Sequence, residues 1–510
     1  MLPARAIRPA LRVIPSLRNA SLRPQPLPKR WYSDKKPAAP AAASPDEYDH
    51  RKLGVQQELF TTSVYSPGSP IFLPNGTRVF NRLVDFLRRQ YTHYGFDEVI
   101  TPNIYKKSLW EVSGHLQNYA DDMYTVTSRS RAPEAAATSC CGDREAPEEG
   151  EGADSRLAEG EDQDYGLKPM NCPGHCLIFA SKNRSYRDLP IRYADFSPLH
   201  RNEISGALSG LTRVRRFHQD DGHIFCRPIQ IGEEVFKTLD FMKTVYGALG
   251  LDYFDFALST RPADHYIGTD AEWERAEAQL RDALEQAGLK YTIKEGDGAF
   301  YGPKIDVMLH DSDGKSHQAG TIQLDFQLPQ RFELEYSAPA PKFEAQGVPL
   351  EEVDAAELEQ NGVATPVLIH RAILGSVERL MALLIEEYKG KWPFWLNPRQ
   401  VAILCLNDTE PVLQWASEVK NVLTGHSHDR ARQPHPTGFA VEIDASKRPL
   451  SKKVAEAQSK QYSLCVVVGP KDVESGTVAV SDWGAGYKGK TNMSPVALLE
   501  KMKEMAATYQ

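Results

Sequence analysis

Hydrophobic residues recur every three or four positions between Thr77 and Tyr94, which is the spacing of a helix with one buried face. Gly95 follows this run directly and predicts that the helix ends there. Residues 96–101 then predict a strand. Pro102 has no amide hydrogen to donate, so this strand is expected to end, or to lie at a sheet edge, at that point.

The next part of the chain is richer in strand patterns than in helix patterns. Strands are predicted at 191–196, 214–226, 253–259, 290–294, 303–310, 320–328 and 367–370, and helices at 231–249, 270–287 and 375–388. Gly250 and Gly288 follow two of these helices, and Asp270 is the expected N-cap of the second. Residues 338–364 form a weakly patterned connector. Clustered strands of this kind predict an α+β domain built on an antiparallel sheet.

The pattern changes after Trp392-Pro393, where strands and helices begin to alternate. The predicted elements are strands at 401–406, 439–443 and 464–468 and helices at 411–423, 449–460 and 495–507. Alternation of this kind is typical of a small α/β domain. We therefore expect a large first domain at 55–395, which would be the catalytic one, and a smaller second domain at 396–510.

The composition agrees with a chain of several soluble parts. With 510 residues the chain exceeds what one core organises, and its 41% hydrophobic and 25% charged residues are ordinary values. It contains no run of about 18 apolar residues, so no membrane partner is expected. Its seven cysteines form an odd set without a regular framework, which predicts reduced thiols rather than disulfides.

Residues 1–32 differ from the rest of the chain. They contain seven arginines and lysines and no acidic residue, which is typical of a mitochondrial transit peptide. Arg30-Trp31-Tyr32-Ser33 also resembles a matrix-protease cleavage site. The alternative to a transit peptide is a disordered basic arm that binds nucleic acid. Losing seven positive charges would change the formal charge from −8 to −15, so nucleic-acid binding would then depend on local basic patches.

Two further segments predict unstructured chain. Residues 33–54 are rich in proline, alanine and charge and are expected to be a linker. Residues 128–164 contain eleven acidic and four basic residues and almost nothing to bury, so we predict an acidic disordered insertion there.

A phosphate-binding pattern near the C-terminus is interpreted as a coincidence. Residues 484–491, GAGYKGKT, match the P-loop motif in full. A working P-loop needs a helix that opens at its Lys-Thr pair, so that free amides face the phosphate. Here Ser494-Pro495 is the better helix start.

The segment from His200 to His223 contains four arginines, at positions 201, 213, 215 and 216. Strand alternation would place one set of side chains on a single face: Arg213, Arg215, Phe217, Gln219, Asp221 and His223. Arg216 would lie on the other face. Cations, an aromatic ring, a carboxylate and an imidazole make a poor core. They predict a site for a nucleotide triphosphate beside a small polar ligand.

Two shorter stretches also contain residue types that carry chemistry. Lys168–His175 holds a cysteine and a histidine between two prolines and a glycine. By itself Cys172 could be a nucleophile, a metal ligand or a buried hydrophobe. In the second stretch, Ile369–Arg379, His370 ends a predicted strand and Arg379 lies in the first turns of a helix.

These stretches resemble a known family. The segment around Pro102, the His200–His223 stretch and the Gly375–Arg379 helix start resemble motifs 1, 2 and 3 of class II aminoacyl-tRNA synthetases. The resemblance narrows to threonyl-tRNA synthetases at Lys168–His175, Gln219–His223, Phe300–Lys304 and Ile369–Ser376. It covers residues 55–510 apart from 128–164. It implies a threonine–tRNA ligase with a class II catalytic domain followed by an anticodon-binding domain.

The resemblance also implies a zinc ion bound by Cys172, His223 and His370. Three protein ligands and an open position suit a metal that binds substrate, here through the amino and hydroxyl groups of threonine. Gln219, Asp221 and Tyr301 would orient the amino acid.

For ATP, which would arrive with Mg²⁺, the family pattern implies a second group of residues. Arg201 would hold the α-phosphate, Glu203 would bind the adenine amino group, and Phe217 and Arg379 would stack on the ring. Arg213 would contact the outer phosphates, and Lys304, Gln318 and Gln323 would line the adenylate pocket. His115 would lie near the terminal ribose of tRNA(Thr) and relay a proton.

The family further implies a homodimer joined through motif 1, and the N-terminal segment implies the mitochondrial matrix. One alternative is a sibling enzyme for serine or proline, which would be expected to lose a zinc ligand. Another is a non-catalytic tRNA-binding relative, which would be expected to lose Arg201 or Arg379; all of these residues are present. The editing domains that family members often carry are expected to be absent, since the chain shows no HxxxH motif of that kind. Ser451 and Ala455 depart from the family pattern in the anticodon-binding domain.

Overall fold

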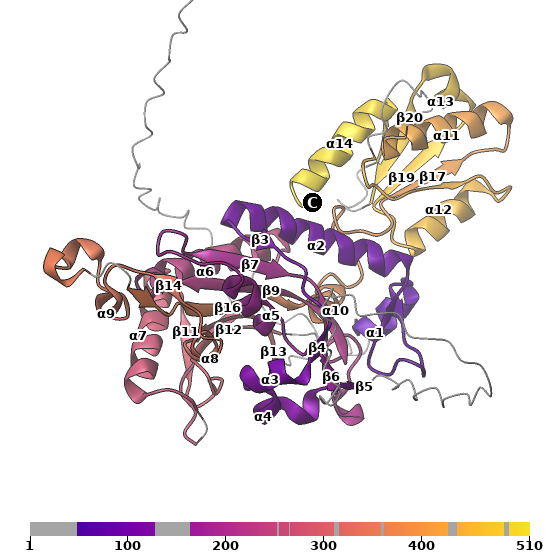
Figure 1. The fold of residues 1–510 in the computed structure, drawn as a ribbon. Coiled ribbons are helices and arrows are strands. Elements are labelled where there is room, and N and C mark those ends of the chain that lie inside the picture. Colours follow the sequence, from indigo (N-terminus) through magenta and orange to yellow (C-terminus); the bar gives the residue numbers. More distant parts are fainter. Residues whose placement is uncertain are drawn as a thin grey trace, which may run out of the picture. The chain divides into compact units, whose positions relative to one another are not determined.

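A mostly antiparallel sheet forms the centre of the first domain (Figure 1). The computed structural model describes residues 48–127, 164–251, 254–264, 266–310, 316–358, 362–426, 436–483 and 489–510. Within these residues the sheet has nine strands in the order β11-β10-β12-β13-β16-β9-β7-β3, with β8 paired to β9. The strands are β3 Asp97–Glu98, β7 Ile191–Asp195, β8 Pro198–His200, β9 Arg216–Cys226, β10 Asp255–Ser259, β11 Tyr291–Lys294, β12 Lys304–His310, β13 Ser316–Asp325 and β16 Val367–Ser376. The predicted α+β class is confirmed.

The central strands are longer or shorter than their sequence patterns predicted. β16 was expected to end at His370 but continues to Ser376, because it pairs with both β13 and β9 as far as Ala372 and with Gln219 of β9 at Ser376, beyond a bulge. Its first eight residues are all buried, so no alternation of buried and exposed positions marks where the strand ends. β9 begins at Arg216 rather than at residue 214. The short strand β3 lies at the edge of the sheet, as Pro102 predicted.

Four helices carry most of the core beside this sheet: α2 Pro74–Tyr94, α6 Ile231–Ala248, α7 Asp270–Gln286 and α10 Val377–Glu387. The predicted ends are confirmed at Gly95, Gly250 and Gly288, which all have a positive φ. The expected N-cap at Asp270 is wrong by one residue. Thr269 caps α7, because its hydroxyl accepts from the amide of Glu272 while the Glu272 carboxylate accepts from the amide of Thr269.

Shorter elements surround this core. They are α1 His50–Gln56, β1 Phe60–Thr61, β2 Ile71–Phe72, β4 Ile104–Lys106, α3 Lys107–Val112, α4 His115–Tyr119, β5 Thr125–Thr127, β6 Asp164–Leu167, α5 Cys172–Ala180, α8 Gln327–Arg331, β14 Tyr336–Ser337, α9 Pro341–Glu344 and β15 Val363–Ala364. Strands β5 and β6 pair with Thr127 opposite Asp164. The predicted transit peptide and almost all of the predicted acidic insertion, residues 128–163, lie outside the described residues. The prediction of an unstructured linker up to residue 54 is wrong at its end, because α1 begins at His50 with Asp49 as its cap.

The second domain has its own sheet, in the order β18-β17-β19-β20-β21. Its elements are β17 Val401–Cys405, α11 Glu410–Thr424, β18 Val441–Asp444, α12 Leu450–Ser459, β19 Leu464–Val468, α13 Pro470–Ser475, β20 Val478–Asp482, β21 Lys490–Met493 and α14 Pro495–Ala507. The α/β prediction is confirmed, although β20, β21 and α13 were not predicted. The rejection of the P-loop is supported, because Lys490-Thr491 begins a strand and α14 starts at Pro495 with Ser494 as its cap.

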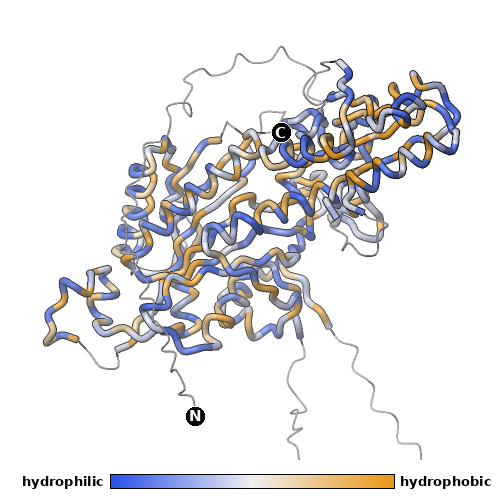
Figure 2. Tube along the Cα trace, turned by 90° about the horizontal axis from the view of Figure 1, so that it is seen from above, coloured by the Kyte–Doolittle hydropathy of each residue, from blue (hydrophilic) through white to orange (hydrophobic). Residues whose placement is uncertain are grey.

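The two sheets have separate hydrophobic cores. Figure 2 shows hydrophobic and hydrophilic residues alternating along the helices, as expected of helices that bury one face. Among the helices that the structure describes, none is both long and apolar enough to cross a membrane.

Candidate active site and metal centre

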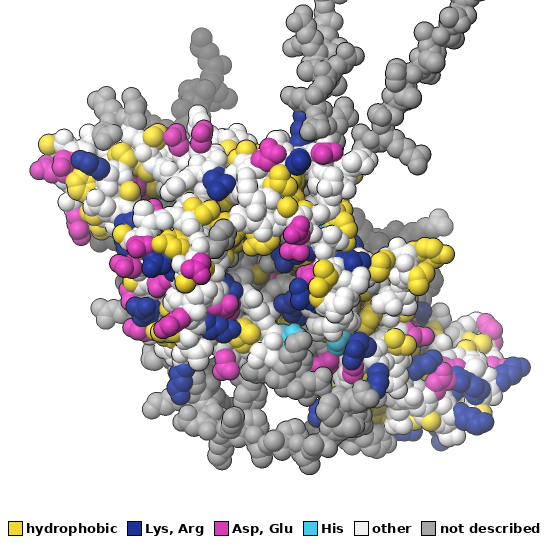
Figure 3. Space-filling model, turned by 90° about the horizontal axis from the view of Figure 1, so that it is seen from below, with side chains coloured by type: hydrophobic (Ala, Val, Ile, Leu, Met, Phe, Trp, Pro, Cys, Tyr) yellow, Lys and Arg dark blue, Asp and Glu magenta, His cyan; other side chains and the backbone are white. Residues whose placement is uncertain are grey.

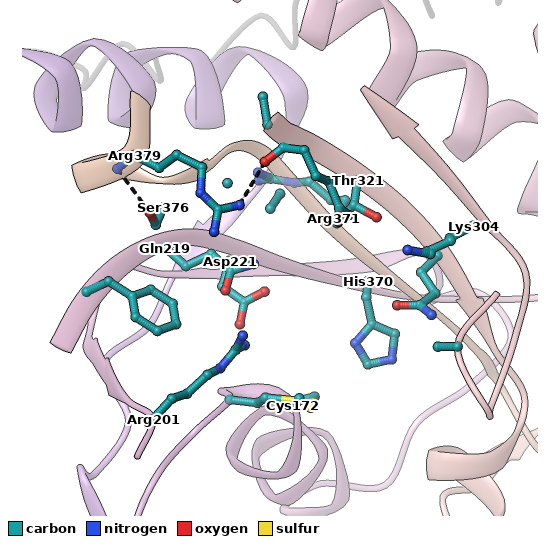
Figure 4. A pocket seen from close by; sticks show the side chains of 18 of the residues that line it. Cys172, Arg201, Gln219, Asp221, Lys304, Thr321, His370, Arg371, Ser376 and Arg379 are labelled. Atoms are coloured by element: carbon teal, nitrogen blue, oxygen red, sulfur yellow. Dashed lines mark hydrogen bonds between the residues drawn. The ribbon is translucent and has the colours of Figure 1, made fainter. Parts of the chain in front are cut away.

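A cavity of about 440 Å³ opens on the central strands of the first domain. Its walls come from β9, β12, β13 and β16, from the start of α5 and from the start of α10. In Figure 4, Cys172 lies on the helix below the sheet and His370 reaches down from a strand above it. Figure 3 shows a face of the molecule on which Lys and Arg side chains gather near exposed His side chains. The cavity brings together all but one of the predicted site residues, the exception being His115.

The three predicted metal ligands meet at one end of this cavity. Cys172 is the first residue of α5, while His223 on β9 and His370 on β16 are directly paired neighbours in the sheet. Their ligand atoms all lie within 4.8 Å of one another, and His223 Nε2 is 2.9 Å from His370 Nδ1. All three side chains are buried. Two imidazoles and a thiol converging in this way form a donor set that zinc prefers.

Burial sets the protonation of these ligands. It raises the pKa of the Cys172 thiol well above its ordinary value and lowers the pKa of His223 well below its own. His223 is therefore neutral and has a lone pair to offer at neutral pH. A bound divalent cation would favour the Cys172 thiolate that burial alone disfavours. The cluster thus fits a zinc ion chemically as well as geometrically.

Asp325 holds the His370 ring, and sequence reasoning missed it. His370 Nε2 lies 2.8 Å from the buried carboxylate Oδ2 of Asp325, so the other nitrogen, Nδ1, faces His223. A metal-binding histidine commonly has its second nitrogen fixed in this way. Strand alternation could have predicted Asp325, because it lies two residues after the predicted Gln323 and therefore on the same face of β13.

Another group of possible ligands, Asp49, His50 and Glu386, does not suit a metal ion. His50 Nδ1 lies 2.7 Å from the Glu386 carboxylate, and His50 Nε2 accepts from the amide of Leu211 at 3.2 Å. Both ring nitrogens are therefore already used.

The residues expected to orient the amino acid lie beside the metal ligands. Gln219, Asp221 and Tyr301 all line the cavity. Asp221 is buried and accepts from Asn171 Nδ2 at 3.1 Å, while the Tyr301 hydroxyl donates to Gln323 at 3.0 Å. Burial raises the pKa of Asp221, and the nearby imidazoles of His175 and His370 lower it in part. A carboxylate next to a metal site can accept hydrogen bonds from an ammonium group.

Three arginines concentrate positive charge at the other end of the cavity. The guanidinium of Arg201 lies 5.0 Å from the centre of the Phe217 ring, and Arg379 donates to the carbonyl groups of Thr212 and Gln318. Burial, and then the charges of Arg201 and Arg213, lower the pKa of Arg379. Arg213 pairs with Glu203 at 2.7 Å. These guanidinium groups repel one another, and a ligand with several negative charges would relieve that repulsion.

The strand-alternation prediction is confirmed in part. Phe217, Gln219, Asp221 and His223 all line the cavity, as expected for alternate residues of β9. Arg213 and Arg215 precede the strand. Arg213 still lines the cavity, whereas Arg215 donates to the carbonyl of Glu203 at 2.9 Å and to Ser205. The prediction for Arg215 was therefore wrong.

A buried carboxylate organises the predicted nucleotide residues on β12 and β13. Asp306 accepts from Gln318 Nε2 at 2.6 Å and from Thr321 Oγ1 at 3.1 Å, and it pairs with Lys304 Nζ at 2.9 Å. Lys304, Gln318 and Thr321 all line the cavity. Asp306 was not predicted, although it alternates with Lys304 on one face of β12.

His115 lies behind the metal ligands rather than on the cavity wall. Its Nε2 is 3.8 Å from Cys172 Sγ, and its Nδ1 is 2.8 Å from Ser113 Oγ. Burial, with a smaller effect from the His370 charge, lowers the pKa of His115 to about 4. The imidazole is therefore neutral at pH 7, and it is a weaker base than an exposed histidine.

Two domain families match this chain. Residues 156–346 match the tRNA synthetase class II core domain (G, H, P, S and T). Residues 400–505 match an anticodon binding domain.

Whole-chain relatives agree with these matches. A probable mitochondrial threonine–tRNA ligase of Schizosaccharomyces pombe is 47% identical over 437 residues, covering 85% of this chain and 84% of that protein. A cytoplasmic threonine–tRNA ligase of Saccharomyces cerevisiae is 44% identical over 432 residues, covering 85% of this chain and 50% of that protein. A crystal structure titled as the RNA binding domain of threonyl-tRNA synthetase from Cryptosporidium parvum has a TM-score of 0.73 and 42% identity, with 90% of this chain and 98% of that chain covered.

Proposed function

This chain belongs to the class II threonyl-tRNA synthetases, and we propose that it recognises threonine at one zinc ion bound by Cys172, His223 and His370. The observation that carries the proposal is the convergence of a thiol and two imidazoles within 4.8 Å, beside the buried carboxylate of Asp221. Zinc bound there would supply an open coordination position for the amino and hydroxyl groups of the substrate.

The chain is a threonine–tRNA ligase, and the cavity supports a division of roles in the first step. A carboxylate oxygen of threonine attacks the α-phosphorus of ATP, and the bond to pyrophosphate breaks to leave threonyl-adenylate. Arg201 holds the α-phosphate and stabilises the charge that develops on it. Gln219, Asp221 and Tyr301 hold the amino acid. Mg²⁺ accompanies the triphosphate.

The remaining cavity residues position the nucleotide. Phe217 and Arg379 stack on the adenine, and Glu203 accepts from its amino group. Arg213 contacts the outer phosphates, so its pairing with Glu203 must yield when ATP binds. Asp306 fixes Lys304 and Gln318 against the adenylate, with Gln323 beyond them.

In the second step, a hydroxyl of the terminal ribose of tRNA(Thr) attacks the carbonyl carbon and AMP leaves. The proton of that hydroxyl passes to His115, which burial keeps neutral at pH 7, although the same lowering of its pKa makes it a weaker base than an exposed histidine.

Replacing Cys172 by alanine should remove the bound zinc. The parent is expected to contain about one zinc per chain by atomic absorption, and the variant very little, because two imidazoles alone leave the site short of a ligand. Cys405→Ala is the matched control, since Cys405 is equally buried but lies in the second domain. Equal zinc in Cys172→Ala and the parent would remove Cys172 from the site.

We also propose that the chain works as a homodimer in the mitochondrial matrix. The arginine-rich, acid-free start and the mitochondrial relative support the compartment, although cytoplasmic relatives are nearly as similar. Exposed apolar side chains before α2 and after β3 support the dimer: Tyr65 is 95% and Ile100 is 88% exposed. Exposed apolar side chains that gather into one patch are typical of interaction sites.

Ile100→Asp is expected to convert the dimer to monomers, because it would place a charge in a desolvated interface. Sedimentation equilibrium measures the mass directly. Val496→Asp is the matched control, since Val496 is also exposed but begins α14 of the second domain. A mass equal to that of the parent for Ile100→Asp would place the interface elsewhere.

A further inference from the structure

His175 lies in the Lys168–His175 stretch, and its imidazole has no role in the reaction described above. It lies on the first turn of α5 and is fully buried. Its ring centre is 4.7 Å from that of His223, and the two Nδ1 atoms are 2.8 Å apart. A hydrogen bond at this distance needs a hydrogen on one of these two nitrogens and a lone pair on the other.

The surroundings of His223 decide which nitrogen carries the hydrogen. His223 Nε2 faces His370 Nδ1 at 2.9 Å, on the side where Cys172 also lies. A neutral imidazole that offers Nε2 to a metal ion carries its proton on Nδ1. His223 Nδ1 is then the donor and His175 Nδ1 is the acceptor. A neutral His175 must consequently carry its own proton on Nε2.

That second nitrogen of His175 is directed toward a firmly held carboxylate. His175 Nε2 lies 3.8 Å from Asp195 Oδ2 and has no hydrogen-bond partner among the described residues. Asp195 is fully buried and accepts from the hydroxyl of Thr101 at 2.7 Å and from the amide of Ser197 at 2.6 Å. Lys168 Nζ also lies 3.8 Å from the same Oδ2 and helps to keep Asp195 ionised. The far end of the arrangement is therefore an ionised carboxylate, which favours an N–H on the nitrogen that faces it.

We propose that His175 is a positioning residue that fixes the tautomer and ring plane of His223, with Asp195 behind it. This inference rests on the proposed zinc site. His370 is held by Asp325 directly, at 2.8 Å, whereas His223 is held by an imidazole that stands between it and the carboxylate. His175 is not a fourth metal ligand, because its Nδ1 meets the side of the His223 ring that is turned away from His370.

The test measures zinc affinity by competition with a chromophoric chelator, using the full chain. His175→Leu removes the acceptor, and His175→Asn keeps an oxygen acceptor near the position of Nδ1. His175→Gln places its amide nearer the position of Nε2 and so serves as a second loss variant if His175→Leu does not fold. Cys176→Ala is the matched control for packing, because Cys176 is the next residue of α5, is equally buried and lies outside the ligand cluster.

His175→Leu and His175→Gln are expected to weaken zinc binding by about 10- to 100-fold, whereas His175→Asn stays within a few-fold of the parent. At limiting zinc the two loss variants should raise the KM for threonine and leave the KM for ATP unchanged. Cys176→Ala should bind zinc as the parent does.

Two results would overturn the inference alone while the zinc site stands: zinc affinity equal to that of the parent in the loss variants, or an equal loss in Cys176→Ala. A parent that binds no zinc would overturn the metal site and this inference together.

Discussion

Valine is expected to be activated about 10⁴-fold less efficiently than threonine, measured as kcat/KM in ATP–pyrophosphate exchange. Valine has nearly the shape of threonine but no hydroxyl. A site built to bind that hydroxyl through Cys172, His223 and His370 leaves buried polar groups without a partner when valine enters. The resulting loss in kcat/KM for valine is much larger than a purely hydrophobic pocket of the same shape could produce.

Serine is the matched control substrate, because it keeps the hydroxyl and lacks only a methyl group. A missing methyl costs about 1–3 kcal/mol, so serine should be rejected only about 10- to 200-fold. Strong rejection of serine with weak rejection of valine would reverse the predicted order. It would show that the pocket selects shape rather than the hydroxyl group.

Replacing Arg201 by alanine is expected to lower kcat for threonine-dependent exchange by about 10²- to 10³-fold. Arg201 lies in the cavity with its guanidinium over Phe217, at the end where Arg213 and Arg379 also gather. Removing it deletes a fixed donor from the position where negative charge develops on the α-phosphate. Zinc content should not change, because Arg201 lies outside the ligand cluster.

Arg216→Ala controls for the loss of an arginine from the same segment. The Arg216 guanidinium lies 3.4 Å from His218 Nε2, outside the cavity lining, so exchange should stay within a few-fold of the parent. Arg201→Lys should recover only part of the activity, since an ammonium lacks the planar pair of donors. Equal losses in Arg201→Ala and Arg216→Ala would point to a folding effect.

The cavity could be predicted from the sequence because its residues come from recognisable stretches. The alternation of side chains along β9 is sufficient to place Phe217, Gln219, Asp221 and His223 on one face of the strand. The limit of that reasoning is visible at Arg215. The alternation was extended back to Arg213, although the strand begins only at Arg216, and the Arg215 side chain turns to Glu203 and Ser205 instead.

Residues that act through other residues were the hardest to predict. Asp306 and Asp325 each alternate with a predicted residue on the same strand, so the signal was present but not specific. His175 and Asp195 carry no such signal. They meet only because α5 packs across β7 and β9, and no spacing in the sequence encodes that contact.

The boundaries of elements were less predictable than their types. β16 passes its expected end by six residues, because it pairs on both sides as far as Ala372 and with β9 again at Ser376. β20 and β21 pair antiparallel at the edge of the second sheet, and the predicted alternation of strands and helices did not include them. In both cases pairing between distant segments decides the result, and a local pattern does not contain it.

The most direct test of the account is a zinc titration of the metal-free chain, followed by threonine-dependent ATP–pyrophosphate exchange and by bound zinc in the same samples. The account predicts that exchange rises in proportion to bound zinc and levels off at about one zinc per chain. Full exchange in samples without bound zinc would contradict the claim that Cys172, His223 and His370 recognise threonine through a metal ion.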